Sequence, residues 1–167
     1  MKKNLQTTFI PRQYMLEKHF ELYYYNDSHL AGIKGHSHDY YEFYFFLEGD
    51  VSMYIEGILY ELDPGDVILI PPGVRHHGVV HDEDKPYRRF VFWISKEYCS
   101  LLEGISADYV YLMRQVETTR RYIWHYDLLG LNALQSKAFQ IIEEQHADRF
   151  GKNTKISLCV NDLILHL

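Results

Sequence analysis

Short apolar segments separated by turn residues run from His36 to Ile94, and this pattern constrains the fold more than any other feature of the chain. The clearest turn is Asp63-Pro64-Gly65-Asp66, because proline fixes φ at its second position and glycine permits a positive φ at its third. Short strands at such spacing are typical of a sandwich or a barrel. We therefore predict a mostly β fold in which this turn joins two antiparallel strands.

Three of these segments are apolar at successive positions, which predicts central strands: 41–47, 67–70 and 90–94. In such strands we expect one face to fill a barrel and the other to be covered by a second sheet, a helix or a partner. An aromatic cluster from Phe20 to Tyr25 predicts a lead-in strand.

After Ser95 the pattern changes, with a short helix predicted over 97–103 and strands over 109–113 and 122–126. Apolar residues then recur at helical spacing in two segments on either side of Gly151. We interpret the chain as a barrel with lead-in strands over 1–127, its core motifs at 35–94, followed by a helical segment over 128–167. The last helix ends on apolar Leu167, which indicates a chain cut before a further domain.

Composition excludes some functions. The formal net charge of -6 provides no basic surface for phosphate backbones, so we do not expect this chain to bind DNA by itself. Cys99 and Cys159 lack metal-site spacing and are predicted to be reduced core thiols. Neither a secretory signal nor an apolar stretch of membrane-spanning length is present, which predicts a cytoplasmic protein.

The candidate site begins with His36, His38 and Glu42, which share one face of an extended strand because side chains alternate with period two. His76 follows a Pro-Pro-Gly turn and is placed to reach the same cavity. Imidazole and carboxylate donors suit zinc, iron, nickel, copper or manganese. The alternative is that the histidines hydrogen-bond to one another and to the carboxylate without a metal.

Aromatic residues near this site are candidates for a platform on which a ligand ring stacks. Tyr44 and Trp93 are predicted to contact the ligand together with the four candidate metal ligands, and further candidates are Phe46, Tyr54 and Trp124. His77 is expected on the opposite face from His76, as a surface residue. Three arginines are expected to be solvated surface charges: Arg75, Arg88 and Arg89.

Two separated motifs resemble the paired signature of the cupin superfamily: His36-x-His38-x-x-x-Glu42 with Gly49, and Gly65 with Pro71-x-Gly73 and His76. The resemblance implies a double-stranded β-helix, or jelly-roll, barrel followed here by two C-terminal α-helices. Leu30 replaces the glycine expected before the first histidine, and Val80 replaces the asparagine expected after the last. Neither position supplies a metal ligand, but both move the chain away from catalytic cupins.

The surrounding sequence narrows the resemblance to the N-terminal sensor domain of AraC-type transcription regulators, over 35–167. A Leu-Glu-Gly turn, the Arg89–Trp93 strand and the two terminal helices carry it. The resemblance implies a barrel that binds a small effector, often a sugar, and helices that form a homodimer. It also implies that DNA is bound only through a C-terminal helix-turn-helix domain outside this chain.

Two other functions compete with an effector sensor. The first is a small metal-dependent cupin enzyme of the isomerase or dioxygenase type, with zinc, nickel, iron or manganese held by the three histidines and Glu42. The second is a structural dimer with an empty barrel. The sequence supplies no evident acid or base beyond the ligand set, so we assign no catalytic residue and predict a protein that is not an enzyme.

Overall fold

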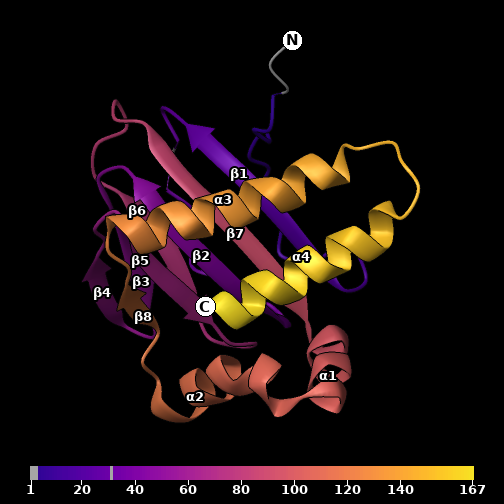
Figure 1. Cartoon of the computed structure of the whole chain (residues 1–167). Helices are drawn as coiled ribbons and strands as arrows, with labels where there is room; N and C mark the ends of the chain where they lie inside the picture. Colours follow the sequence, from indigo (N-terminus) through magenta and orange to yellow (C-terminus); the bar gives the residue numbers. More distant parts are fainter. Residues whose placement is uncertain (1–3, 31) are drawn as a thin grey trace.

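The computed structural model describes residues 4–30 and 32–167, which form two antiparallel sheets and a set of helices (Figure 1). A cavity lies between the two sheets. The five-stranded sheet has the order β1 (Phe20–Asp27), β7 (Tyr87–Ser95), β2 (Tyr40–Glu48), β5 (Asp66–Ile70) and β8 (Ile123–His125). The three-stranded sheet has the order β4 (Ile58–Glu61), β3 (Val51–Ile55) and β6 (His76–Val80). The mostly β fold with terminal helices is confirmed.

The strands predicted to be central are those in the middle of the larger sheet. β7 lies between β1 and β2, and β2 also pairs with β5. The predicted lead-in strand is β1, whose register with β7 runs from Phe20↔Ile94 to Asp27↔Tyr87. Since opposed residues share a face, this register separates side chains that point into the barrel from those that point out.

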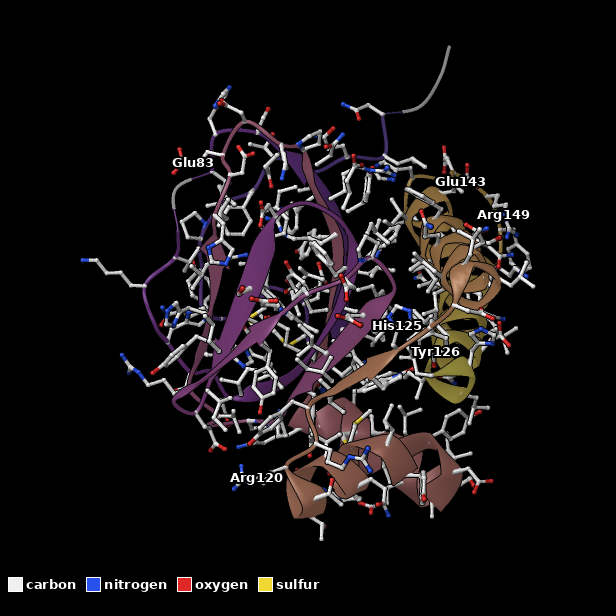
Figure 2. All side chains as sticks on the ribbon, turned by 90° about the vertical axis from the view of Figure 1, so that its left-hand side faces the viewer. Glu83, Arg120, His125, Tyr126, Glu143 and Arg149 are labelled. Carbon is white, nitrogen blue, oxygen red and sulfur yellow. The ribbon has the colours of Figure 1, made fainter. Side chains whose placement is uncertain are left out.

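A helical layer covers the outer face of the larger sheet (Figures 1 and 2). It consists of α3 (Leu128–Gln145) and α4 (Lys152–His166), which confirms the two predicted terminal helices. Phe139 of α3 packs edge-on against Tyr24 of β1 and Phe90 of β7, with ring centroids 5.0 and 4.9 Å apart. The outward aromatic residues of the sheet are therefore covered by a helix, which was predicted as one of three possible covers.

A smaller helical segment follows β7: α1 (Lys96–Ile105), the short 3-10 helix η1 (Ala107–Val110) and α2 (Tyr111–Thr119). The predicted helix over 97–103 and strand over 122–126 are confirmed as α1 and β8, but the strand predicted over 109–113 is wrong. Val110, Met113 and Val116 are buried at three-residue spacing, so helical packing decides the conformation despite the aromatic composition.

Both cysteines are buried and free, as predicted. In the part of the chain that the structure describes, no helix has the length and apolar character needed to cross a membrane.

The predicted turn at Asp63–Asp66 forms, with the Asp66 N–H donating to the Asp63 carbonyl over 2.9 Å and Gly65 at φ +108°. The expectation that it joins two paired strands is wrong. It links β4 of the smaller sheet to β5 of the larger one, because β5 pairs with β2 and β8. The Tyr126 N–H donates to the Gly65 carbonyl over 2.9 Å, so the turn also contacts the segment that leads into α3.

We expect Gly65→Ala to lower the free energy of unfolding by at least about 1 kcal/mol more than Gly57→Ala. Both glycines have a positive φ, but a Cβ at Gly65 would overlap the Tyr126 carbonyl, whereas nothing lies within 4 Å of a Cβ at Gly57. Urea unfolding of the two variants measures the difference. Equal destabilisation would show that the contact with Tyr126 does not constrain this turn.

Candidate functional site

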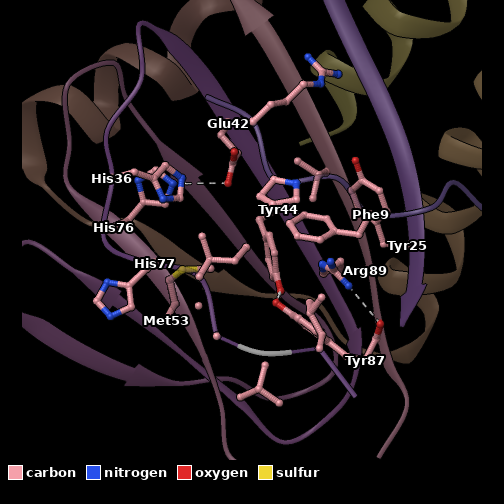
Figure 3. A pocket seen from close by; sticks show the side chains of 18 of the residues that line it. Phe9, Tyr25, His36, Glu42, Tyr44, Met53, His76, His77, Tyr87 and Arg89 are labelled. Atoms are coloured by element: carbon pink, nitrogen blue, oxygen red, sulfur yellow. Dashed lines mark hydrogen bonds and ion pairs between the residues drawn. The ribbon is translucent and has the colours of Figure 1, made fainter. Parts of the chain in front are cut away.

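The two sheets enclose a cavity of about 240 Å³, lined also by residues 9–13 of the N-terminal segment (Figure 3). Its wall is formed by inward side chains of β2 and β7 on one side and by residues of β3 and β6 on the other. Histidines lie toward one end of the cavity and Arg89 with Tyr87 toward the other. The interior is therefore chemically asymmetric.

Backbone pairing brings the three predicted histidines together. His36 and His76 exchange two backbone hydrogen bonds, of 3.1 and 2.9 Å, and the His38 carbonyl accepts from the Gly73 N–H over 2.8 Å. One side-chain nitrogen from each histidine lies within 4.8 Å of those of the other two. The Pro-Pro-Gly turn thus holds the second motif against the first.

Each imidazole is oriented by a backbone carbonyl. The Nδ1 atoms lie 2.9–3.0 Å from carbonyl oxygens of residues 34, 40 and 74. A carbonyl only accepts, so each Nδ1 carries the proton, and in the neutral ring Nε2 keeps a free lone pair. The Nε2 atoms of His38 and His76 are buried and have no hydrogen-bond partner among the described residues.

Glu42 of β2 faces these nitrogens. Its Oε2 lies 3.4 Å from His38 Nε2 and its Oε1 lies 3.7 Å from His76 Nε2, while Trp93 Nε1 donates to Oε2 over 2.6 Å. Burial alone would raise the pKa of Glu42, but the two imidazoles lower it well below its usual value. The carboxylate is therefore ionised.

Burial and the Glu42 carboxylate also shift the pKa values of His76 and His36. Burial would lower the pKa of His76, yet the Glu42 carboxylate outweighs it and raises that pKa. Burial lowers the pKa of His36. The Glu42 charge can therefore be balanced in two ways. Either His76 is protonated and forms an ion pair with Glu42, or a cation lies between the histidine nitrogens and the carboxylate.

The residues present fit a divalent transition metal. Unpartnered Nε2 atoms of buried imidazoles converge beside an ionised carboxylate, and each Nδ1 bonds to a carbonyl, which is the arrangement usual around metal-bound histidines. His36, His38, His76 and Glu42 are the residues that would hold the ion. Donors of this kind do not choose among zinc, nickel, iron and manganese.

Of the predicted aromatic contacts, Tyr44 and Trp93 line the cavity, and the Tyr44 hydroxyl bonds to that of Tyr87. The other candidates are not among its lining residues: Phe46 is buried, Tyr54 is 38% exposed and Trp124 is half-buried on β8.

His77 differs from its expected surface position. It is half-buried, borders the cavity and packs against Tyr54 in a tilted arrangement, with ring centroids 5.1 Å apart. Its register partner is Tyr54, whereas that of His76 is the fully buried Ile55. The two adjacent histidines therefore occupy different environments.

The expectation that Arg89 is a solvated surface charge is wrong. Its side chain is only 2% exposed, lines the cavity and pairs with Asp27 over 2.8 Å, whereas Arg75 is exposed and Arg88 is partly exposed. The sequence contains the signal for this position, since Arg89, Val91 and Trp93 alternate with Phe90 and Phe92.

Arg12 is a second cavity residue that the sequence reasoning missed. It donates to Glu21 over 2.5 Å and to the Tyr23 hydroxyl over 2.6 Å, and its guanidinium lies 4.7 Å from the Trp93 ring centre. No periodic pattern marks the irregular segment that carries it, so no signal in the sequence indicates this position.

Residues 20–125 match the family model described as the AraC-like ligand binding domain. The match covers more than half of the chain, and the chain belongs to this family. The family is one of ligand-binding domains, and its match spans the two sheets and the histidine cluster.

Three solved structures illustrate the similarity. A cupin protein from Bacteroides fragilis is 22% identical, with 56% of this chain and 86% of that chain covered and a TM-score of 0.42. A cupin 2 conserved barrel domain protein from Salinispora arenicola is 21% identical, with 53% of this chain and 73% of that chain covered and a TM-score of 0.43. KdgF from a Halomonas species is 19% identical, with 47% of this chain and 71% of that chain covered and a TM-score of 0.40. No curated protein matches the chain.

We expect the protein to bind one zinc or nickel ion, and His38→Ala to weaken that binding at least about tenfold. Protons compete for the lone pairs, so affinity should fall as the pH decreases through the raised pKa of His76. Isothermal titration at several pH values measures both effects. His77→Ala is the matched control, and an equal loss in that variant would contradict this ligand set.

Proposed function

We propose that the chain is the effector-binding domain of an AraC-type transcription regulator and not an enzyme. The enclosed cavity carries this proposal, because its walls bring polar groups and aromatic faces from two sheets together in a chain of the AraC-like ligand binding family. The cavity's volume of about 240 Å³ suits a small molecule.

The proposed effector is a sugar or a sugar derivative. The aromatic residues Trp93 and Tyr25 line the cavity together with the hydrogen-bonding residues Glu42, Tyr44 and His36. Such a combination suits a ring that has apolar faces and a hydroxylated edge. A bound zinc, nickel, iron or manganese ion would supply a Lewis acid that attracts an oxygen of the effector.

The proposed partners follow from the helical layer. We place the division between the effector-binding part (1–127) and the dimerisation part (128–167) at the start of α3, which Asp127 caps by accepting from the Gly130 N–H over 2.8 Å. The homodimer forms through α3 and α4. In this proposal the regulator is cytoplasmic, and DNA is bound only through a helix-turn-helix domain outside this chain.

A metal-dependent cupin enzyme is the second candidate, favoured by the convergence of three imidazoles, two of which face Glu42. The two candidates differ in what the carboxylate does. In an enzyme, Glu42→Gln abolishes turnover. In a sensor, the same change alters effector affinity, and no product forms from any bound molecule.

Native mass spectrometry of the untagged chain, with elemental analysis of the same sample, tests the proposed function. We expect a small molecule to copurify and to be recovered chemically unchanged. Trp93→Leu should reduce its occupancy at least about tenfold, because a buried aromatic contact and the bond to Glu42 are lost. Tyr54→Leu is the control outside the cavity, and conversion of the bound molecule would favour the enzyme.

We also expect the chain to be a dimer that Leu158→Glu combined with Leu165→Glu converts to a monomer. These leucines are 61% and 54% exposed and lie seven residues apart on one face of α4. Analytical ultracentrifugation measures the change. Leu101→Glu, on α1 and 52% exposed, is the control, and a wild-type monomer would contradict the proposed dimer.

A further inference from the structure

Arg89 is a buried charge at the end of the cavity away from the histidines (Figure 3). It lies on β7 opposite Tyr25 of β1 and Phe46 of β2, and its side chain is 2% exposed. Arginine is rarely buried to this degree without a complete set of partners. A hydrogen-bond donor of Arg89 that has no acceptor in the chain would therefore indicate the kind of ligand that the cavity binds.

The hydrogen bonds of Arg89 are all made by one of its two terminal nitrogens. Nη1 donates to Asp27 Oδ2 over 2.8 Å and to the Tyr87 carbonyl over 3.2 Å. Nη2 is buried and has no partner among the described residues. A buried donor on a charged group is costly to leave unpaired, so an oxygen from outside the chain is the expected acceptor.

Aromatic rings hold the guanidinium in place. Its central carbon lies 4.0 Å from the Tyr87 ring centre, 4.8 Å from that of Tyr25 and 5.1 Å from that of Phe9. Burial raises the pKa of Tyr87 and of Tyr25 to about 12, so both phenols are neutral and supply no competing negative charge. The rings leave the edge of the guanidinium as the polar part of this subsite.

The opposite end of the cavity has the opposite charge. Glu42 is the only acidic residue among the described residues that line the cavity, and it lies opposite Trp93 of β7. Arg89 is four residues from Trp93 on the same strand, which is about 13 Å of extended chain. When no cation occupies the histidine cluster, an anionic group on a ligand is therefore repelled by Glu42 and is placed better at the Arg89 end.

The second cavity arginine does not compete for this role. Both terminal nitrogens of Arg12 have partners, namely the Tyr14 carbonyl for Nη1 and Glu21 with Tyr23 for Nη2. Only Arg89, of these two, keeps a terminal nitrogen without an acceptor. Because the Asp27 carboxylate makes a formally neutral pair with Arg89, a group with one negative charge suits the site better than a phosphate dianion.

We propose that the effector carries a carboxylate, which accepts hydrogen bonds from Arg89 Nη2 while the rest of the molecule extends toward Glu42. This inference rests on the proposed function and narrows it, since the carboxylate of a sugar acid accepts a charge-assisted hydrogen bond from Nη2, whereas a neutral sugar offers only the weaker acceptor of a hydroxyl or ring oxygen. The carboxylate takes the place of the missing acceptor.

Acetate is the probe for this subsite, with isosteric acetamide and inorganic phosphate as comparisons. The arginine side-chain NMR signals of the wild-type chain are followed during each titration at constant ionic strength. We expect saturable shifts of the Arg89 signals with millimolar acetate and at least tenfold weaker binding of acetamide and phosphate. No saturable response to acetate, or an equal response to acetamide, overturns the proposal and indicates an ordered water at Nη2.

A paired variant separates recognition from folding. Arg89→Met combined with Asp27→Asn removes both charges, so neither is left buried without its partner. We expect this variant to keep its circular dichroism spectrum and to lose acetate binding at least tenfold. Arg88→Met is the control, because Arg88 pairs with Glu48 on the surface. Retained acetate affinity in the folded double variant overturns the assignment to Arg89.

Different results would contradict the carboxylate subsite and the effector-binding function. A neutral molecule that copurifies in the cavity, together with no acetate response at Arg89, removes the carboxylate subsite but leaves the effector-binding function standing. Acetate binding at Arg89 combined with chemical conversion of the copurified molecule supports the subsite and contradicts the sensor.

Discussion

The pairing of β2 with β7 is the interaction on which the rest of the structure depends. Both strands are buried on both faces, and their register sets Glu42 against Trp93 and Tyr44 against Val91. The inward residues form the wall of the cavity, and the outward residues Phe43, Phe90 and Phe92 belong to the apolar core. A slip of one residue would exchange the two sets, so burial on both sides fixes the register.

Polar groups inside this barrel are stabilised as separate local pairs. Arg12 meets Glu21, Arg89 meets Asp27, and Glu42 faces two imidazoles. Each pair offsets the desolvation of its own members, which permits opposite charges at the two ends of one cavity. Three of the buried atoms without partners belong to these groups, namely His38 Nε2, His76 Nε2 and Arg89 Nη2, and a ligand or an ion that pairs with them adds most.

Alternation of side chains with period two explains both what the sequence predicted and what it missed. It predicted His36, His38 and Glu42 on one face of a strand. The structure brings them together with His76, but β2 begins only at Tyr40, so backbone hydrogen bonds to the second motif hold His36 and His38 in place. The same rule applied to β7 puts Arg89 inside with Trp93, although arginine is usually exposed. The segment 109–113 was misassigned because its aromatic content favours strand while its buried residues follow helical spacing. Arg12 had no local signal, because irregular chain is positioned by tertiary contacts alone.

One strand gives the cavity and the helical layer a common boundary. Arg89 and Phe90 are adjacent on β7, with Arg89 on the cavity wall and Phe90 against Phe139 of α3. Because the two side chains leave one strand on opposite faces, a change in the backbone position of β7 would alter the cavity wall and the surface against which α3 packs together.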